Sequence, residues 1–277
     1  MTPILRSIQL AGGVRLRYAE QGDPSGMPVV MLHGITDSWR SFESVMAHLP
    51  ASLRVFAVSQ RGHGESDRPG SYRTRDFAAD AAAFIEALDL GPALAVGHSM
   101  GSANAMRLAI DRPDLLRGLV TAGAFAGFRD KAELVAFHRS TIEPLRDPID
   151  PAFAAEWQQS TLAQPVPPAF FDMVVRECLR APAVVWRDAF AALFEDDFAA
   201  EIGRIAVPTL VVWGDRDAMC PPGDQERILR AIAGSRLLTY AGAGHALHWE
   251  EPARFADDLA GFATALASPT FSEETFQ

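Results

Sequence analysis

A glycine-flanked serine is the strongest candidate nucleophile in this sequence of 277 residues. It occurs in the pentapeptide Gly97-His98-Ser99-Met100-Gly101, between a short apolar run at residues 93–96 and an alanine-rich stretch at residues 102–110. A GxSxG pattern between a strand and a helix is typical of a sharp turn that presents the serine hydroxyl. Gly97 and Gly101 suit that turn because they lack a Cβ where the strand and the helix approach closely. We therefore predict nucleophilic acyl transfer at Ser99.

A serine hydroxyl is a weak nucleophile at neutral pH, so this chemistry also requires a histidine base. His245 is the predicted base, because it follows the apolar run at residues 237–240 in a glycine-rich loop. Active sites of open α/β sheets lie at such carboxyl ends of strands. His33 is tied to a tight turn, and the side chain of His98 diverges from that of its neighbour Ser99.

The base needs a carboxylate that orients it, and two candidates follow the apolar run at residues 209–213. Either Asp215 or Asp217 could serve, and we predict that Asp217 orients the histidine while Asp215 braces the turn. The resulting chain order is Ser99, Asp217, His245, which is the order found in the α/β sheet enzymes that use this triad.

The oxyanion formed during attack on a carbonyl needs two backbone N–H donors. Met100, which follows the nucleophile, is predicted to supply one of them. The second is predicted to come from Ile35, because the chain leaves the apolar run at residues 29–32 through a turn at Gly34. Glycine at this position permits the close approach of a substrate.

Short apolar runs alternate with helical stretches along the chain, which predicts an α/β fold with a mostly parallel sheet and helices on both faces. Two early segments, residues 4–10 and 14–19, flank a Gly-Gly pair and predict a hairpin that completes an eight-stranded sheet. The expected parallel strands are residues 29–32, 55–58, 93–96, 119–121, 209–213 and 237–240. The expected helices are residues 76–88, 102–110 and 225–232.

One long stretch breaks this alternation. Residues 125–205 show no strand pattern. They contain several helical patterns separated by prolines, and many aromatic side chains. Such a length cannot be a loop within a compact domain, so we predict a helical cap inserted into the core. The predicted core domain then comprises residues 1–124 and 206–277.

Composition excludes several classes of function. Lys and Arg number 25 against 35 Asp and Glu, and the net charge of −10 has the wrong sign for binding nucleic acid or an anionic membrane surface. Cys178 and Cys220 match no metal-ligand spacing, so we expect reduced thiols, no metal and a cytoplasmic location. The first residues lack the apolar segment of a signal peptide. A homodimer is left open.

Five segments together resemble the α/β-hydrolase fold superfamily, in its branch of small hydrolases with a cap. They are HG at residues 33–34, RGHGESDRP at 61–69, GHSMG at 97–101, WGDRD at 213–217 and GHALHWEEP at 244–252. Relatives usually carry Asp two residues before the Arg of the RGxG loop, where this chain has Ser59. The resemblance implies the eight-stranded hydrolase fold, the triad named above, and a cap that covers the pocket.

The type of nucleophile narrows the expected reaction. Ser99 implies an acyl-enzyme, whereas family epoxide hydrolases and dehalogenases use Asp in its place. Family carbon-carbon bond hydrolases often carry GNSMG and a Trp after the catalytic histidine, where this chain has His98 and Ala246. We therefore expect a cofactor-free serine carboxylesterase, whose partners are a small, fairly hydrophobic ester and water. The alternatives are carbon-carbon bond hydrolysis, lactonase or perhydrolase activity, and a ligand-binding receptor with vestigial hydrolysis.

Overall fold

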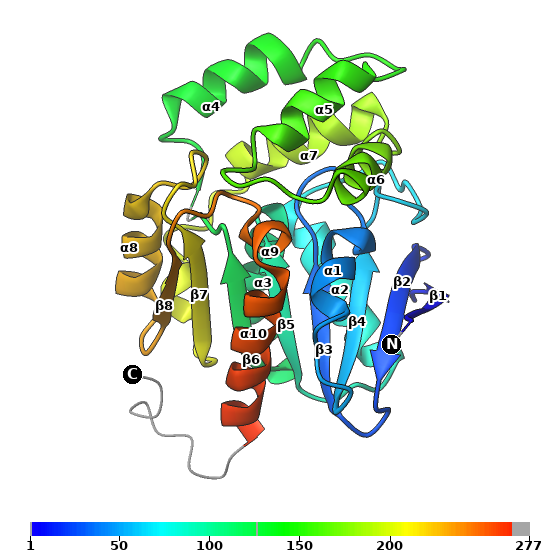
Figure 1. Ribbon diagram of the computed structural model, residues 1–277, viewed down its shortest axis with the longest axis vertical. Helices are drawn as coiled ribbons and strands as arrows, with labels where there is room; N and C mark the ends of the chain where they lie inside the picture. The colour runs from blue at the N-terminus through cyan, green and yellow to red at the C-terminus, as the bar shows by residue number, and fades with distance from the viewer. Residues whose placement is uncertain (1, 126, 268–277) are drawn as a thin grey trace.

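A single sheet organises the computed structural model, which describes residues 2–125 and 127–267 (Figure 1). The strand order is β1-β2-β4-β3-β5-β6-β7-β8, and all pairs are parallel except β1 with β2 and β2 with β4. The strands are β1 (Ile4–Gln9), β2 (Arg15–Gly22), β3 (Met27–Leu32), β4 (Leu53–Ser59), β5 (Ala93–His98), β6 (Leu116–Ala122), β7 (Thr209–Gly214) and β8 (Arg236–Tyr240). The predicted α/β fold and its mostly parallel, eight-stranded sheet are confirmed.

Helices cover both faces of the sheet, and the residues of β3 show why. Val29 and Met31 pack in one apolar cluster with α1 and α10, whereas Val30 and Leu32 pack in the other with α2 and α3. All four side chains are buried, so the strand is apolar throughout and does not alternate. The helices of the core are α1 (Glu43–Met46), α2 (Thr74–Ala87), α3 (Met100–Asp111), α8 (Pro222–Ala231), α9 (Leu247–Glu250) and α10 (Pro252–Ala267).

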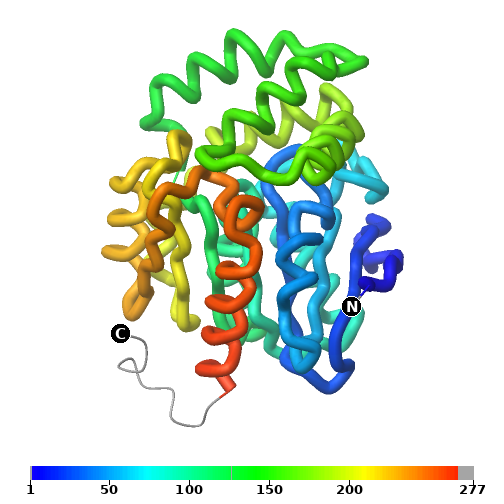
Figure 2. The backbone as a smooth tube through the Cα atoms, in the orientation of Figure 1, coloured from blue at the N-terminus to red at the C-terminus, as the bar shows by residue number. Residues whose placement is uncertain are grey.

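In the described part of the chain between β6 and β7 lie four further helices, which together extend over one end of the sheet (Figures 1 and 2). They are α4 (Ala132–Phe137), α5 (Pro151–Gln159), α6 (Pro168–Cys178) and α7 (Ala183–Glu195). Trp186 is fully buried among them, and its ring centroid lies 5.4 Å from that of Phe153 and 5.8 Å from that of Trp157. We refer to residues 125–205 as the cap. Its division from a core domain of residues 1–124 and 206–277 stays a prediction, and residues 1, 126 and 268–277 lie outside the described residues.

Short helical turns complete the chain, and the bounds of regular elements differ from the predicted ones by a few residues. The turns are η1 (Trp39–Phe42), η2 (Pro113–Leu115), the π turn η3 (His138–Ile142) and η4 (Ile202–Arg204). β6 begins at Leu116, three residues earlier than predicted, because Arg117 and Gly118 interrupt the apolar pattern. A Cβ on Gly118 would lie 2.6 Å from Leu266 Cδ1 of α10, so close packing accounts for this glycine. Within the described residues, no helix is both long enough and apolar enough to span a membrane.

Candidate active site

Ser99 lies in a strained turn between β5 and α3. Its φ of 52° and ψ of −117° are rare for a residue with a side chain, and such strain is typical of functional sites. A Cβ on Gly97 would lie 2.2 Å from the carbonyl oxygen of Gly101, and a Cβ on Gly101 would lie 2.0 Å from that of Leu32. Only glycine therefore fits at these two positions, and the packing of β5 and β3 against α3 enforces the turn that presents Ser99.

His245 and Asp217 meet at the carboxyl ends of β8 and β7. The Nδ1 atom of His245 lies 2.8 Å from Asp217 Oδ2, and both side chains are buried. The other carboxylate oxygen, Oδ1, accepts hydrogen bonds from the backbone N–H groups of Met219 (2.8 Å) and Cys220 (2.9 Å). Burial alone would raise the pKa of Asp217, but the adjacent His245 and these hydrogen bonds bring that pKa below its ordinary value. The carboxylate can therefore accept the Nδ1 proton, which leaves the His245 Nε2 lone pair available as a base.

Asp215 makes a different contact from Asp217. Its Oδ1 atom accepts a hydrogen bond from the backbone N–H of Gly242 at 2.7 Å, and its side chain is 39% exposed. It therefore ties the end of β7 to the loop that carries His245. Of the two predicted candidates, Asp217 is the one that the structure places against the histidine.

The predicted oxyanion donors belong to two backbone segments, one of which begins directly after Ser99. Met100 is the first residue of α3, so its N–H group has no carbonyl partner in the helix. Ile35 follows Gly34 in the loop after β3, and both residues line the same cavity as Ser99 and His245. The assignment of these two N–H groups to an oxyanion hole stays a prediction.

His33 fixes the backbone of the loop that carries Ile35. Its Nε2 atom accepts a hydrogen bond from the backbone N–H of Gln60 (3.0 Å), so its Nδ1–H donates to the carbonyl of Gly34 (2.7 Å). Burial lowers the pKa of His33 well below its usual range, which keeps the ring neutral and preserves this pattern. The Gln60 side chain in turn donates to the His33 carbonyl and accepts from Asn104. The loop is therefore held in place before a substrate arrives.

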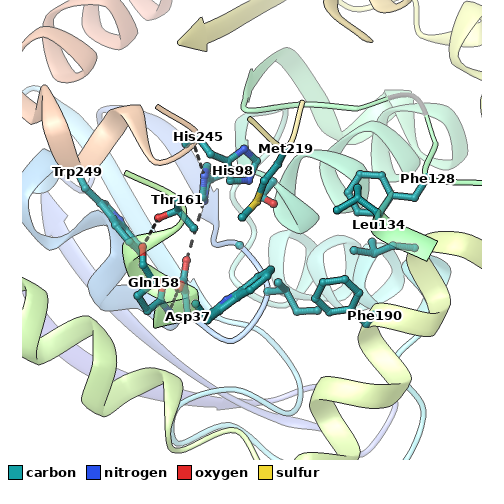
Figure 3. A pocket seen from close by; sticks show the side chains of 15 residues that line it. Asp37, His98, Phe128, Leu134, Gln158, Thr161, Phe190, Met219, His245 and Trp249 are labelled. Atoms are coloured by element: carbon teal, nitrogen blue, oxygen red, sulfur yellow. Dashed lines mark hydrogen bonds and ion pairs between the residues drawn. The ribbon is translucent and has the colours of Figure 1, made fainter. Parts of the chain in front are cut away.

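A cavity between the core and the cap contains these residues, and its two ends differ in character (Figure 3). Asp37, Gln158 and Thr161 lie toward one end, and Phe128, Leu134 and Phe190 lie toward the other, with His245 and His98 above them in the view. The lining residues are Gly34, Ile35, Asp37, His98, Ser99, Phe128, Leu134, Trp157, Gln158, Thr161, Phe190, Leu193, Met219, His245 and Trp249. The cap thus supplies a mainly apolar wall to a site whose reactive groups come from the core.

The charge inside this cavity is negative or neutral. Among the described lining residues there is no Lys or Arg, whereas Asp37 contributes a buried carboxyl group. The Lys131 ammonium lies 4.8 Å from the centroid of the Phe128 ring, but it forms an ion pair with the buried Asp224. The residues of the site that the structure describes therefore offer no unpaired Lys or Arg to an anionic substrate.

The loop of His245 is tied to the cap by a carboxylate for which the sequence motifs predict no role. Glu250 Oε1 accepts hydrogen bonds from the backbone N–H groups of Ala163 (2.6 Å) and Gln164 (3.1 Å), and Oε2 accepts one from Gly244 (2.9 Å). Glu250 thus joins the residue before His245 to the segment that follows α5. Nothing in the local pattern around Glu250 signals this bridge, because its cap partners are 86 and 87 residues away in the chain.

Three side chains at this site, Asp217, Cys220 and His245, are potential metal ligands. Ligand atoms of Asp217, Cys220 and His245 lie within 4.8 Å of one another. Both oxygens of Asp217 already accept hydrogen bonds from the protein, and one of them holds the Nδ1 side of His245. Burial raises the pKa of Cys220, which disfavours the thiolate that a metal would need. The three side chains therefore suit an arrangement in which Asp217 orients His245 better than they suit a metal centre.

Comparison with known proteins identifies the family. Residues 29–258 match the alpha/beta hydrolase family, so the chain belongs to that family. Its sequence is similar to a non-heme chloroperoxidase from Streptomyces lividans, with 28% identity covering 92% of this chain and 98% of the relative. A 2-(acetamidomethylene)succinate hydrolase from Mesorhizobium japonicum is 41% identical, over 39% of each chain. The structure resembles an esterase from Exiguobacterium antarcticum, with a TM-score of 0.85, 26% identity, and coverage of 94% of this chain and 100% of that one.

Proposed function

We propose that this hydrolase is a carboxylesterase that cleaves neutral esters of small, fairly hydrophobic molecules through an acyl-enzyme at Ser99. The observation that carries the proposal is the cavity in which Ser99, His245 and the oxyanion loop meet a mainly apolar wall. Apolar walls with few polar groups are typical of sites for small organic ligands. The structural similarity to the esterase from Exiguobacterium antarcticum, which covers 94% of this chain, supports the same reaction class.

In this mechanism the Ser99 hydroxyl attacks the ester carbonyl while His245 Nε2 takes its proton. Asp217 keeps the Nδ1 proton in place and stabilises the imidazolium that forms. The oxygen of the tetrahedral intermediate is stabilised by the N–H groups of Ile35 and Met100. His245 then protonates the leaving alcohol, and water attacks the acyl-enzyme in the same way to release the acid and restore Ser99.

The electrostatics of the cavity favour a neutral substrate. Burying an unpaired charge costs several kcal/mol, and a carboxylate placed beside Asp37 would also face a like charge. No lysine or arginine among the described lining residues would offset the cost of burying the carboxylate or its repulsion from Asp37. The name of the Mesorhizobium japonicum relative indicates a succinate-like acid as its substrate. By this reasoning, such acids are poorer substrates for this chain than neutral esters.

A perhydrolase is the second candidate, because the similarity to the non-heme chloroperoxidase extends over 92% of the chain. Hydrogen peroxide would replace water as the nucleophile that attacks the acyl-enzyme. The products would be a peracid and free Ser99. This reaction uses the same acyl-enzyme and differs only in the second step.

A pair of esters that differ in charge tests the proposal. With ethyl pentanoate and monoethyl glutarate in a pH-stat assay at pH 7.5, we expect kcat/KM to be at least about tenfold higher for the neutral ester, because the anion would be buried without a partner. Peracid formation on addition of peroxide is measured in parallel. A preference for the glutarate, or no hydrolysis of either ester, would contradict the proposal.

A further inference from the structure

A second buried carboxyl group lies in the cavity, and the acyl-transfer mechanism does not use it. Asp37 lies on the loop between β3 and η1, is 5% exposed, and lines the same cavity as Ser99. Its Oδ1 atom accepts a hydrogen bond from Gln158 Nε2 of cap helix α5 at 3.2 Å. Its Oδ2 atom accepts one from Ser41 Oγ at 3.3 Å. Both bonds are long, so the carboxyl group retains acceptor capacity toward the cavity.

A buried acceptor without a partner lies beside this carboxyl group. His98 Nε2 donates to the carbonyl oxygen of His245 at 3.1 Å, so the other ring nitrogen, Nδ1, carries a lone pair. This Nδ1 atom is buried, has no hydrogen-bond partner among the residues that the structure describes, and lies 4.0 Å from Asp37 Oδ2. Two acceptors at that separation can both lie within about 3 Å of one donor atom placed between them. Figure 3 shows Asp37 and His98 facing each other across this contact.

In the described part of the chain, the groups that surround Asp37 leave its charge without a permanent counter-ion. Burial lowers the pKa of His98 to about 3 and that of His248 well below its usual range, so both rings are neutral. Burial raises the pKa of the Cys178 thiol of α6 to about 12, so the thiol is protonated. During acyl transfer His245 carries a positive charge while it holds the proton of the nucleophile. Burial also raises the pKa of Asp37 to about 7, against the hydrogen bonds that lower it.

We propose that Asp37 and His98 form a polar subsite that binds a neutral hydrogen-bond donor of the substrate, a hydroxyl or an amide N–H. This inference rests on the proposed esterase function and adds a determinant of specificity to it. A substrate that is apolar except for its ester would leave the buried acceptor of His98 unpaired. A substrate with a correctly placed donor would satisfy it. Sites that hydrogen-bond a substrate hydroxyl discriminate strongly against analogues that lack it.

Two pairs of esters test the subsite, one for each side of the scissile bond. On the acyl side, p-nitrophenyl 3-hydroxybutanoate is compared with p-nitrophenyl 3-methylbutanoate. On the alcohol side, 2-hydroxyethyl butanoate is compared with propyl butanoate. Each pair exchanges a hydroxyl for a methyl group of similar size, so the ratio of the two kcat/KM values isolates the donor. We expect wild type to prefer the hydroxyl compound of at least one pair by about tenfold or more, the effect of one hydrogen bond to a strong acceptor.

Substitutions at Asp37 should reduce or remove that preference. Asp37→Leu deletes one of the two acceptors and leaves His98 Nδ1, so the ratio is expected to fall by about threefold or more. Asp37→Asn keeps the shape, but its amide oxygen is drawn to the Gln158 donor and its NH₂ group then faces the His98 acceptor, so in this variant the ratio is expected to fall to about one. Asp172→Leu, which removes an exposed carboxylate of α6, is the matched control and should retain the wild-type ratio.

The measured ratios decide whether the polar subsite exists. Equal rates for both members of both pairs in wild type would overturn it, as would an unchanged wild-type ratio in Asp37→Leu or a preference that survives in Asp37→Asn. If Asp37→Leu does not fold, the same ratio in Asp37→Asn decides. Failure of the proposed function has a different signature, since no ester of either pair would then be hydrolysed. Failure of the subsite alone would appear as ester hydrolysis that is indifferent to the hydroxyl.

Discussion

Ser99→Ala is expected to lower kcat for ester hydrolysis by about 10⁵- to 10⁶-fold, the size of effect measured when the nucleophile of a serine triad is removed. The variant keeps a Cβ at the strained position, where φ is 52°, so the turn between β5 and α3 should remain intact. The loss would therefore reflect the missing nucleophile. The measurement is the rate of ethyl pentanoate hydrolysis at pH 7.5, together with the thermal unfolding midpoint.

The matched control for this variant is Ser44→Ala. Ser44 is a half-buried residue of α1 and is not among the described residues that line the cavity, so its replacement should leave the rate within about twofold of wild type. If Ser99→Ala retained more than a tenth of the parent activity, acyl transfer through Ser99 would be wrong.

Asp217→Asn should lower kcat by about 10⁴-fold, because it reverses the tautomer of His245. The backbone N–H groups of Met219 and Cys220 point at one carboxylate oxygen, so an asparagine would place its carbonyl oxygen there. Its NH₂ group would then face His245 Nδ1 and donate to it. The remaining proton of the ring would lie on Nε2, which could no longer accept a proton from Ser99.

Asp215→Asn is the control that separates the two candidate carboxylates. An asparagine at this position can still accept the hydrogen bond from the Gly242 N–H through its amide oxygen, so activity should remain within about tenfold of wild type. Equal losses in the Asp215 and Asp217 variants would refute the distinct role given to Asp217. A normal rate in Asp217→Asn would do so as well.

The residues predicted from the sequence share a common signal. Ser99, Asp217 and His245 each follow an apolar run that forms a parallel strand, and parallel strands of one sheet end at the same edge. Local pattern and fold class together were therefore enough to predict that these three residues lie near one another. The sequence predicts that Asp217, and not Asp215, orients His245. The structure adds a physical reason, because two backbone N–H groups hold Asp217 Oδ1 and leave Oδ2 facing His245 Nδ1.

The residues that join the cap to the core could not be predicted in this way. Asp37 contacts Gln158 across 121 positions, and Glu250 contacts Ala163 across 87. Such contacts depend on how the four cap helices pack on the sheet. The hydrophobic periodicity within either segment does not predict that packing. A buried carboxyl group in a loop has the same sequence signature as an exposed one.

The aromatic residues of the cap illustrate the same limit. Phe128, Trp157 and Phe190 line the cavity, whereas Phe153 and Trp186 pack inside the cap. Trp157 does both, because its ring also contacts Trp186. Hydrophobicity alone cannot separate these roles, since burial against a neighbouring helix and burial against a ligand select the same side chains.

Direct detection of the acyl-enzyme tests the central claim. Wild-type protein is mixed with p-nitrophenyl trimethylacetate, whose hindered acyl group slows the second step, and is quenched with acid during the burst of p-nitrophenolate. Mass spectrometry of the digested protein should locate one trimethylacetyl group on the hydroxyl of Ser99, with no adduct in Ser99→Ala. An acyl group on another residue, or a stoichiometric burst without any covalent adduct, would contradict the account.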